Sequence, residues 1–325
     1  MSEATTGSNY MLNHYTRGYG HPRLVNILAR LYGKLMRQDL NPMSDILVTV
    51  GAFEALHCAC QGLINPGDEV SEIEENRLMI GHSIIRNWQQ QFSSRTKAIF
   101  LNNPQNPLGK VYNSCELEFI ADLCIKHDVI CVSDEVYEWL VYDKKQHIRI
   151  AKFPGMWERT ITIGSAGKSF SVTGWKVGWA VGPAHLISPM QLYHHHSIRT
   201  LCTPTQEAVA IAFEKEFELL QSSNSYFNTL QKDVELSRNQ LCGYLSDAGI
   251  RPIIPGGGYF IVADISSIDT GENLNDCNDD DEPYDLKFVK WAIREKKVTM
   301  IPLSIFYSPE HRNLGEKYVR ICFVK

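Results

Sequence analysis

The chain has 325 residues, of which 44% are hydrophobic and 21% are charged, and its formal net charge is −5. This length and composition are typical of a globular protein with a large core and two or three domains. The negative charge disfavours a nucleic-acid partner and no apolar run approaches membrane-spanning length, so we expect small molecules as ligands and no membrane association.

The nine cysteines are scattered along the chain, several of them within apolar strand or helix patterns. An odd and dispersed set indicates reduced thiols, in the cytoplasm or alternatively in the mitochondrial matrix. Cys58 and Cys60 lie in one helical run without a second ligand pair at a suitable spacing, so we expect no metal site. The polar residues 1–9 lack the apolar segment of a secretory signal.

The chain begins with a lead-in that we place at residues 1–44. Within it, residues 24–36 have apolar side chains at the spacing of an amphipathic helix. A strand is predicted over residues 45–50, and Gly51 begins a helix that ends at the turn 65–67. A helix entered from a strand through glycine presents free backbone amides to an anion, although many α/β proteins share this pattern.

The next segment is the least regular part of the pattern. Residues 68–70 begin a strand, but residues 71–76 are too polar for a buried parallel strand. The apolar residues that follow have the spacing of one helical face: Leu78, Ile80, Ile84, Ile85 and Trp88. Another strand is predicted over residues 97–102, and Asn113 and Glu116 have the spacing of a capping box at the start of the next helix.

Two further strands lead to the most distinctive side chains. An apolar run over residues 129–133 precedes Asp134 and Tyr137, and a β-branched strand over residues 161–163 leads through small residues to Lys168. An amine at the end of a parallel-sheet strand is a good nucleophile for a carbonyl carbon when burial or a neighbouring cation favours its neutral form. A solvated surface lysine after a strand is the alternative.

The C-terminal part is predicted to form a second, smaller domain. A strand over residues 178–182 is followed by a helix-compatible stretch with three histidines, 194–196, which we expect on a solvated face because adjacent residues point in different directions. A long helical pattern over residues 225–245 then crosses to the C-terminal part, and the acidic residues 276–282 are expected to be a solvated loop. The remaining strands are predicted over residues 259–264, 298–302 and 319–324, and one helix is predicted over residues 288–293.

Several of these stretches together resemble one enzyme family. The motifs that carry the resemblance surround Asn106, Asp134, Lys168 and Lys176. They are similar to those of the pyridoxal 5′-phosphate (PLP) enzymes of the aspartate aminotransferase fold. Within that fold, the kynurenine-oxoglutarate transaminases, also called cysteine-S-conjugate β-lyases, and above all type 3 of that family, share the segments 15–22, 153–159 and 282–285.

The resemblance implies an α/β fold, the PLP-dependent transferase fold of aspartate aminotransferase type. In this fold a large domain with a mostly parallel sheet is joined to a smaller C-terminal α+β domain. We place the large PLP-binding domain at residues 1–225 and the small domain at residues 226–325. The chain is shorter than the family pattern at both ends, and residues 71–91 replace a longer segment that carries a ring stacked on the cofactor.

The resemblance also implies roles for individual residues. Lys168 would attach the cofactor and move the Cα proton, Asp134 would pair with the ring nitrogen, and Arg320 would bind the α-carboxylate of the substrate. The other expected contacts are Gly51, Ala52, Phe53, Ser165 and Lys176 at the cofactor phosphate, Tyr137 and Asn106 at the ring hydroxyl with Asn106 also at the substrate, and Tyr15 at the phosphate of a neighbouring subunit.

Some of these residues have a structural alternative in the sequence alone. Asn106 can be only a turn former, Arg320 can form a structural ion pair, and Tyr15 can pack the lead-in. Arg199 stands where the family tends to carry an aromatic residue.

We therefore expect PLP-dependent transamination of kynurenine and other aromatic or sulfur amino acids with a 2-oxo acid acceptor, in a homodimer and with β-lyase side activity. A decarboxylase or a synthase of the same fold is disfavoured by the segments shared with the kynurenine transaminases. The other alternative is a catalytically impaired variant that acts as a dimer partner or binding protein, because the chain ends and residues 71–91 depart from the family pattern.

Overall fold

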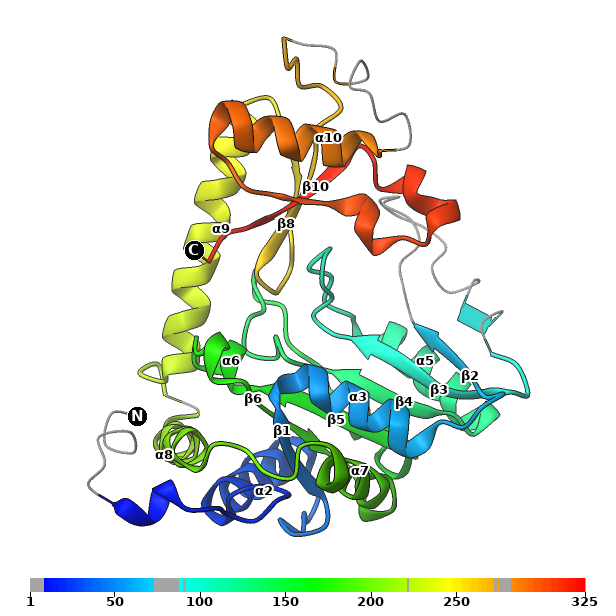
Figure 1. Ribbon diagram of the computed structural model, residues 1–325, viewed down its shortest axis with the longest axis vertical. Coiled ribbons are helices and arrows are strands. Elements are labelled where there is room, and N and C mark those ends of the chain that lie inside the picture. Colours follow the sequence, from blue (N-terminus) through cyan, green and yellow to red (C-terminus); the bar gives the residue numbers. More distant parts are fainter. Residues whose placement is uncertain are drawn as a thin grey trace.

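The computed structural model describes residues 9–72, 88, 89, 92–220, 222–271, 274 and 282–324. It contains a six-stranded sheet covered by helices on both faces and a four-stranded antiparallel sheet packed beside two further helices (Figure 1). The predicted fold class, with a mostly parallel large sheet and a smaller C-terminal part, is confirmed. The domain boundary between residues 225 and 226 stays a prediction. Within the described ranges, no helix combines the length and apolar character needed to cross a membrane.

Five strands of the large sheet run parallel to one another and one runs against them. In spatial order the strands are β1 (Ile46–Val50), β6 (Val177–Val181), β5 (Thr160–Ser165), β4 (Ile130–Asp134), β3 (Thr96–Asn102) and β2 (Glu69–Glu72). β6 pairs antiparallel with β1 and β5, and the other three pairs are parallel. The apolar runs predicted as strands are these strands, with ends that differ by one or two residues.

β2 accounts for the polar residues Ser71 and Glu72. It is a four-residue strand at the edge of the sheet, parallel to β3. An edge strand leaves one side unpaired, so charged residues there do not have to be buried between neighbouring strands. The helix predicted from Leu78 onward falls mostly outside the described residues.

Alternate strand residues pack on opposite faces of the large sheet, as the twofold period of a strand requires. Five helices of 13 to 17 residues cover this sheet: α2 (Pro22–Met36), α3 (Gly51–Leu63), α5 (Ser114–His127), α7 (Ala184–Ser197) and α8 (Thr203–Leu219). Leu47 and Val132 pack with α3 and α7 on one face, whereas Ile46, Ile99 and Cys131 pack with α2, α5 or α8 on the other. α8 was not predicted.

Local signals set the helix ends. α2 begins at Pro22, where the missing amide proton costs nothing. At the start of α5 the predicted capping box is present, because Asn113 Oδ1 accepts from the Glu116 amide at 3.0 Å and Glu116 Oε2 accepts from the Asn113 amide at 2.9 Å. Asp128 then ends α5 in the left-handed region.

The smaller sheet comes from the C-terminal part of the chain. Its strands, in spatial order, are β7 (Arg251–Ile253), β8 (Phe260–Asp264), β10 (Tyr318–Cys322) and β9 (Ile301–Pro302). It packs with the long helix α9 (Tyr226–Asp247) and with α10 (Tyr284–Trp291). α9, β8 and β10 were predicted closely, β9 is shorter than predicted, and β7 was not predicted.

Short helical turns complete the connections. They are η1 (Tyr10–Asn13), η3 (Ile150–Lys152), η4 (Trp157–Arg159), α6 (Ala166–Ser169), η5 (Thr173–Trp175), η7 (Ala292–Lys296), η8 (Leu303–Phe306) and η9 (Pro309–Leu314). Of these, α6 carries Lys168 directly after β5.

The prediction of a solvated histidine triplet is wrong for its first member. His195 and His196 are exposed, but His194 is fully buried on α7. Its Nδ1 lies 2.6 Å from Glu54 Oε1 and its Nε2 lies 2.9 Å from the carbonyl oxygen of Gly18. Burial of this side chain is tolerated because each ring nitrogen lies within hydrogen-bond distance of an acceptor oxygen, and the helical period turns only this histidine inward.

Candidate active site

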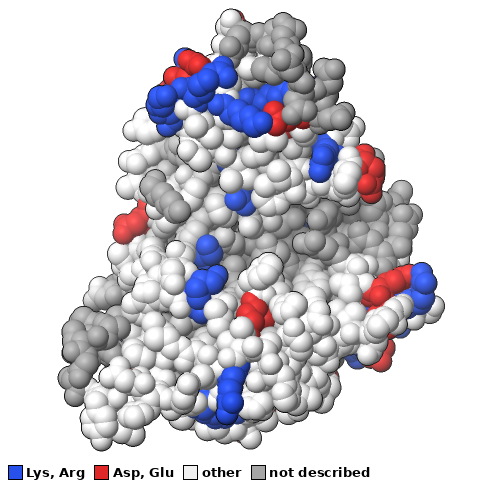
Figure 2. All heavy atoms as spheres, viewed as in Figure 1, with Lys and Arg blue, Asp and Glu red and all other residues white. Residues whose placement is uncertain are grey.

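One cavity brings together ten of the eleven predicted site residues. Its volume is about 360 Å³, and it lies at the carboxyl ends of β3, β4 and β5, the edge where α/β proteins bind ligands. Figure 2 shows the surface hollowed between the part with α10 and the part with α3, with isolated basic side chains beside the hollow. The predicted residues that line the cavity are Gly51, Ala52, Phe53, Asn106, Asp134, Tyr137, Ser165, Lys168, Lys176 and Arg320.

The N-terminal end of α3 faces the cavity with its backbone amides. The chain enters the helix through Gly51, whose φ of +72° is in the region that favours glycine. Glu54 accepts a hydrogen bond from the Val50 amide, but among the described residues no side chain is seen to cap the amides of Gly51, Ala52 and Phe53, which all line the cavity. Uncapped amides and the positive end of the helix dipole make this end of the cavity suited to an anion.

Lys176 adds a positive charge at the same end. A Cβ placed on Gly51 would lie 3.3 Å from Lys176 Nζ, so the ammonium group is close to the start of α3. Gly178 allows β6 to lie this close to the start of α3. A Cβ at position 178 would lie 2.4 Å from the carbonyl carbon of Gly51 and would clash with it. The antiparallel strand β6 thus begins where the parallel strands end, and it brings Lys176 to the shared edge.

Asp134 lines the cavity at the end of β4. Its Oδ1 accepts a hydrogen bond from the Val136 amide at 3.2 Å. Burial is the main cause that raises the pKa of Asp134 to about 6; the Glu135 carboxylate raises this pKa further, whereas the Val136 amide and Lys168 lower it. A cationic ligand group beside Asp134 would relieve this unfavourable burial of its charge.

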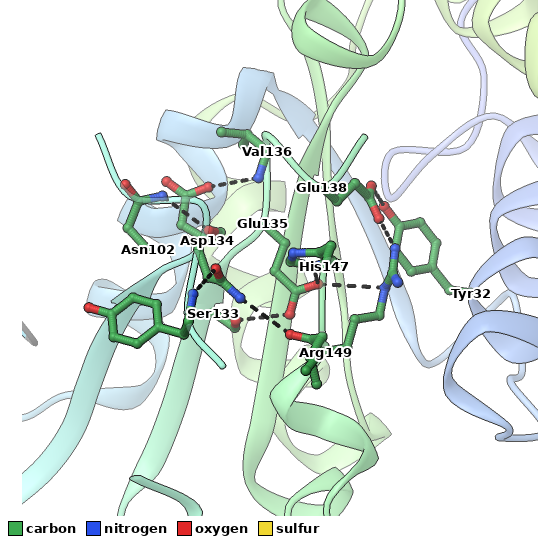
Figure 3. A network of polar contacts seen from close by, with 12 residues as sticks. Tyr32, Asn102, Ser133, Asp134, Glu135, Val136, Glu138, His147 and Arg149 are labelled. Carbon is green, nitrogen blue, oxygen red and sulfur yellow. Dashed lines mark hydrogen bonds and ion pairs between the residues drawn. The ribbon is translucent and has the colours of Figure 1, made fainter. Parts of the chain in front are cut away.

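A buried polar network lies directly behind Asp134 (Figure 3). Glu135 follows Asp134 in the chain, and its carboxylate accepts from His147 Nε2 at 2.8 Å and from the Ser133 hydroxyl at 2.9 Å. Arg149 Nε lies 3.5 Å from the same carboxylate. Because buried carboxylates are costly without donors, these contacts fix the backbone that presents Asp134.

The other half of the network centres on Glu138. Arg149 donates to Glu138, and the Tyr32 hydroxyl donates to the same carboxylate at 2.5 Å. Tyr32 in turn accepts from the indole nitrogen of Trp179 at 3.0 Å. Helix α2 and strand β6 are thereby linked to the turn that carries Tyr137.

Asn102 is a residue that the sequence reasoning missed. Its Nδ2 donates to the Asp134 carbonyl at 3.1 Å, and its Oδ1 accepts from the Asn106 amide at 2.6 Å. It therefore fixes two predicted site residues relative to each other. Its place at the start of the same Asn/Pro turn was the signal that could have indicated it.

Arg320 enters the cavity from β10 of the smaller sheet. Its Nη1 donates to Asn106 Oδ1 at 2.9 Å, and the guanidinium carbon lies 4.0 Å from the ring centroid of Phe260. Its buried Nε has no hydrogen-bond partner, and within the described residues no carboxylate pairs with it. A structural ion pair, the alternative for this arginine, is therefore not seen in the described part of the chain, and a ligand carboxylate would satisfy the guanidinium.

Six lining residues were not in the predicted set. They are Leu56, Asn102, Val136, Gly167, Thr173 and Phe260. Val136, Gly167 and Thr173 adjoin predicted site residues within the same motifs, whereas Phe260 comes from the distant strand β8 and had no local signal.

Tyr15 is the predicted site residue that lies outside this cavity. Its side chain is 92% exposed and lines a separate groove of about 700 Å³ with Arg17, Tyr19 and Arg199. The expectation that Tyr15 reaches a neighbouring subunit stays a prediction. Most of the predicted replacement segment 71–91, and with it the question of ring stacking, lies outside the described residues.

The cavity is thus divided by charge. One end suits an anion, Asp134 presents a carboxylate whose buried charge a cation would relieve, Lys168 lines the same cavity, and Arg320 is open to a carboxylate. This arrangement can hold a zwitterionic ligand together with a phosphorylated heterocycle.

Comparisons with known proteins agree with this chemistry. Residues 82–325 match the family model for aminotransferases of class I and II. The chain is 48% identical to kynurenine-oxoglutarate transaminase 3 of Mus musculus, over 97% of this chain and 75% of that protein, and 44% identical to kynurenine-oxoglutarate transaminase 1 of Homo sapiens, over 98% and 82%. The crystal structure of Bna3p from Saccharomyces cerevisiae superimposes with a TM-score of 0.89 at 28% identity and covers 99% of this chain and 82% of that one.

Proposed function

The chain belongs to the class I and II aminotransferases, whose cofactor is PLP, and from this premise we propose that it transfers the α-amino group of kynurenine to a 2-oxo acid. Other aromatic and sulfur amino acids are further proposed substrates. The observation that carries the proposal is the single cavity, in which each polar part of the cofactor and of an amino acid has a complementary group.

The residues of the cavity fit PLP. The phosphate would lie at the start of α3 with Lys176 and Ser165, and the ring hydroxyl would lie near Tyr137 and Asn106. Asp134 gives the most stringent test of the fit: the raised pKa of its carboxyl group signals a buried charge without a sufficient cationic partner, which a protonated ring nitrogen supplies.

When bound, PLP supplies the electron sink that makes the Cα–H bond of an attached amino acid acidic. Lys168 would attach the cofactor through Nζ and, once the amino acid has displaced it, take the Cα proton on the same nitrogen. Asp134 would keep the ring nitrogen protonated. Lys168 would then return the proton to the cofactor side, and water would release the 2-oxo acid.

Arg320 is proposed to bind the α-carboxylate, which orients the Cα–H bond toward Lys168. We expect Arg320→Leu to raise the KM for kynurenine roughly ten- to a hundredfold, because charge-assisted hydrogen bonds to a carboxylate contribute about 1.5–3 kcal/mol. Arg320→Lys should recover part of this loss, since it keeps the charge but not the planar fork. Steady-state kinetics with varied kynurenine measures both.

The matched control is Arg251→Leu. Arg251 lies on β7 of the same sheet, is exposed and pairs with Asp264 away from the cavity. Its removal should leave KM unchanged. If Arg320→Leu also left KM unchanged, the carboxylate site would lie elsewhere.

The β-lyase activity is proposed from the same proton step. When Lys168 has removed the Cα proton, the electron pair left at Cα can expel a good leaving group from Cβ, so transamination and β-elimination use one site. Release of a thiol from a cysteine S-conjugate by the wild type, and its loss together with transamination in Lys168 variants, is the measurement.

A homodimer is also proposed. Its support is Tyr15, which is exposed and lines a groove separate from the active-site cavity of the same chain. An exposed aromatic side chain in this position can reach a second copy of the chain. Sedimentation equilibrium of the chain with PLP tests this, and a monomer at micromolar concentration would contradict it.

The experiment that tests the proposed function is the visible absorption spectrum of the purified chain with added PLP, followed by borohydride reduction and peptide mapping. We expect a stable band that kynurenine bleaches, and a reduced adduct on Lys168. No band, or labelling scattered over surface lysines, would favour the alternative of an impaired variant that acts as a dimer partner or binding protein.

A further inference from the structure

Two aromatic rings lie around the amine of Lys168. Nζ is 5.4 Å from the ring centroid of Tyr137 and 5.1 Å from that of Tyr259. The two rings meet edge to face, with centroids 5.3 Å apart and an interplanar angle of 69°. Both side chains are buried, so the rings are held in place by packing.

Tyr259 comes from a part of the chain far from Lys168. It directly precedes β8, after Gly258, whose φ of +80° turns the backbone toward the cavity. The Tyr259 hydroxyl donates to the carbonyl oxygen of Lys168 at 3.1 Å. Burial raises the pKa of Tyr259 to about 12, so the residue remains a neutral hydrogen-bond donor with an intact ring at physiological pH.

We propose that Tyr259, together with Tyr137, forms an aromatic cage that stabilises the ammonium form of Lys168, and that Tyr259 is therefore a positioning residue for the base of the reaction. The inference rests on the proposed role of Lys168. Tyr137 already has a proposed contact with the cofactor, whereas Tyr259 has none.

The cage acts at the step where charge appears on Lys168. As the Cα–H bond breaks, its electron pair stays with the substrate carbon and the proton forms a new N–H bond at Nζ, so an ammonium group is created inside the cavity. A cation within about 6 Å of an aromatic centroid is stabilised by about 0.5–1 kcal/mol at exposed sites and by more when desolvated. The rings thus favour the product of proton abstraction without competing for the lone pair.

Other charges act on the same nitrogen and must be separated from the effect of the rings. Among the described residues, the charged and titratable groups seen to face Lys168 or to line its cavity are Asp134 on β4, Tyr137 after β4, Lys176 before β6, Tyr259 before β8 and Arg320 on β10. Asp134 favours the ammonium, whereas Lys176 and Arg320 disfavour it. Replacing the neutral Tyr259 ring leaves all three charges in place.

The test is the pH dependence of Lys168 labelling in the full chain freed of cofactor. Isotope-coded acetic anhydride is applied in pulses at a series of pH values, and the Lys168 peptide is quantified by mass spectrometry. Only the neutral amine reacts, so the midpoint of the curve reports the protonation of Nζ independently of accessibility. We expect Tyr259→Leu to lower this midpoint by about 0.4–0.7 pH units.

Variants at the same position separate the ring from the hydroxyl. Tyr259→Phe keeps the ring, so the midpoint should stay within about 0.2 pH units of the wild-type midpoint. A difference of this size corresponds to the usual deviation from additivity between independent substitutions. In case the leucine variant does not fold, Phe and its 4-fluoro, 3,5-difluoro and 3,4,5-trifluoro analogues at position 259 keep the shape and weaken the ring quadrupole stepwise. The midpoint should fall along this series.

Phe288→Leu is the control. Phe288 lies in the same buried cluster and its ring packs against Trp291 on α10, with centroids 5.4 Å apart, away from Gly258 and Lys168, so the midpoint should not move. An unchanged midpoint in Tyr259→Leu, a fluorinated series without a trend, or a shift in Tyr259→Phe as large as in Tyr259→Leu would each overturn the cage. Failure of PLP to be trapped on Lys168 would overturn the proposed function but leave this titration intact.

Discussion

Lys168→Ala is expected to lower the kcat for transamination of kynurenine by at least about 10⁴-fold. The substitution removes the amine that is proposed both to attach the cofactor and to take the Cα proton, and general-base catalysis alone contributes up to about 10⁴. The chain should still bind PLP non-covalently, because the start of α3, Asp134 and Lys176 are unchanged. Single-turnover kinetics, with absorption spectra recorded in parallel, measure both effects.

Two variants serve as controls for this result. Lys168→Arg keeps a positive charge that cannot act as a base at neutral pH, so it should be as inactive as the alanine variant. Lys152→Ala removes an exposed lysine on η3, outside the cavity, and should be fully active. Retention of more than trace activity in Lys168→Ala would show that another group is the nucleophile.

Asp134→Asn is expected to slow Cα-proton abstraction by about 10²- to 10³-fold while changing the KM for kynurenine by less than about fivefold. The carboxylate is proposed to stabilise charge that the ring nitrogen carries during proton transfer, and loss of one such electrostatic contact typically costs this much. A deuterium isotope effect at Cα should increase as the step becomes rate-limiting. Equal losses in rate and binding would indicate a structural role for Asp134 instead.

The same substitution should alter the pH dependence of stability in the cofactor-free chain. The pKa of Asp134 is raised to about 6 in the folded chain, chiefly by burial, from an ordinary value near 4. The folded state therefore binds this proton more tightly than the unfolded state, and the resulting stability, complete below about pH 4, is lost as the pH rises through 6.

Between pH 5 and pH 7.5, the wild type should lose about 1 kcal/mol of unfolding free energy more than Asp134→Asn. Urea unfolding at the two pH values measures this difference. Asp128→Asn, which changes an exposed carboxylate at the end of α5, is the control and should follow the wild type. Bound PLP should reduce the difference, since the ring nitrogen then supplies the missing cation.

The parts of the site that could be predicted from the sequence are those in which residues close together in the chain form the motif. The run before Asp134, the small residues before Lys168 and the glycine before α3 each combine a strand with a chemical group, and the structure places all three at one edge of one sheet. Asn113 and Glu116 could be paired because a capping box spans only three residues. Parallel strands made the convergence predictable, since their carboxyl ends share an edge.

The features that were missed depend on contacts between distant parts of the chain. Burial of His194 depends on Glu54 and on a backbone carbonyl of the lead-in, and the two histidines that follow it gave the opposite indication. Tyr259 and Phe260 lie at the start of β8 in the smaller sheet, yet Tyr259 donates to the Lys168 carbonyl and Phe260 lines the cavity, which no local pattern shows. The raised pKa of Asp134 depends in part on Glu135, whose burial is made tolerable by His147 and Arg149.

The pairing of β1 with β6 has a consequence for biosynthesis. Ile46 pairs with Val181, so β1 and the start of α3 leave the ribosome about 130 residues before the strand that flanks them, which at 5–20 residues per second is roughly 7–26 s. Throughout that interval the apolar faces of β1 and α3 are without their sheet, and they are available to chaperones. The end of the cavity that suits an anion needs Gly51 and Lys176 together, so it cannot form before about half of the chain has been made, and the vitamin-derived cofactor cannot assist folding before that point.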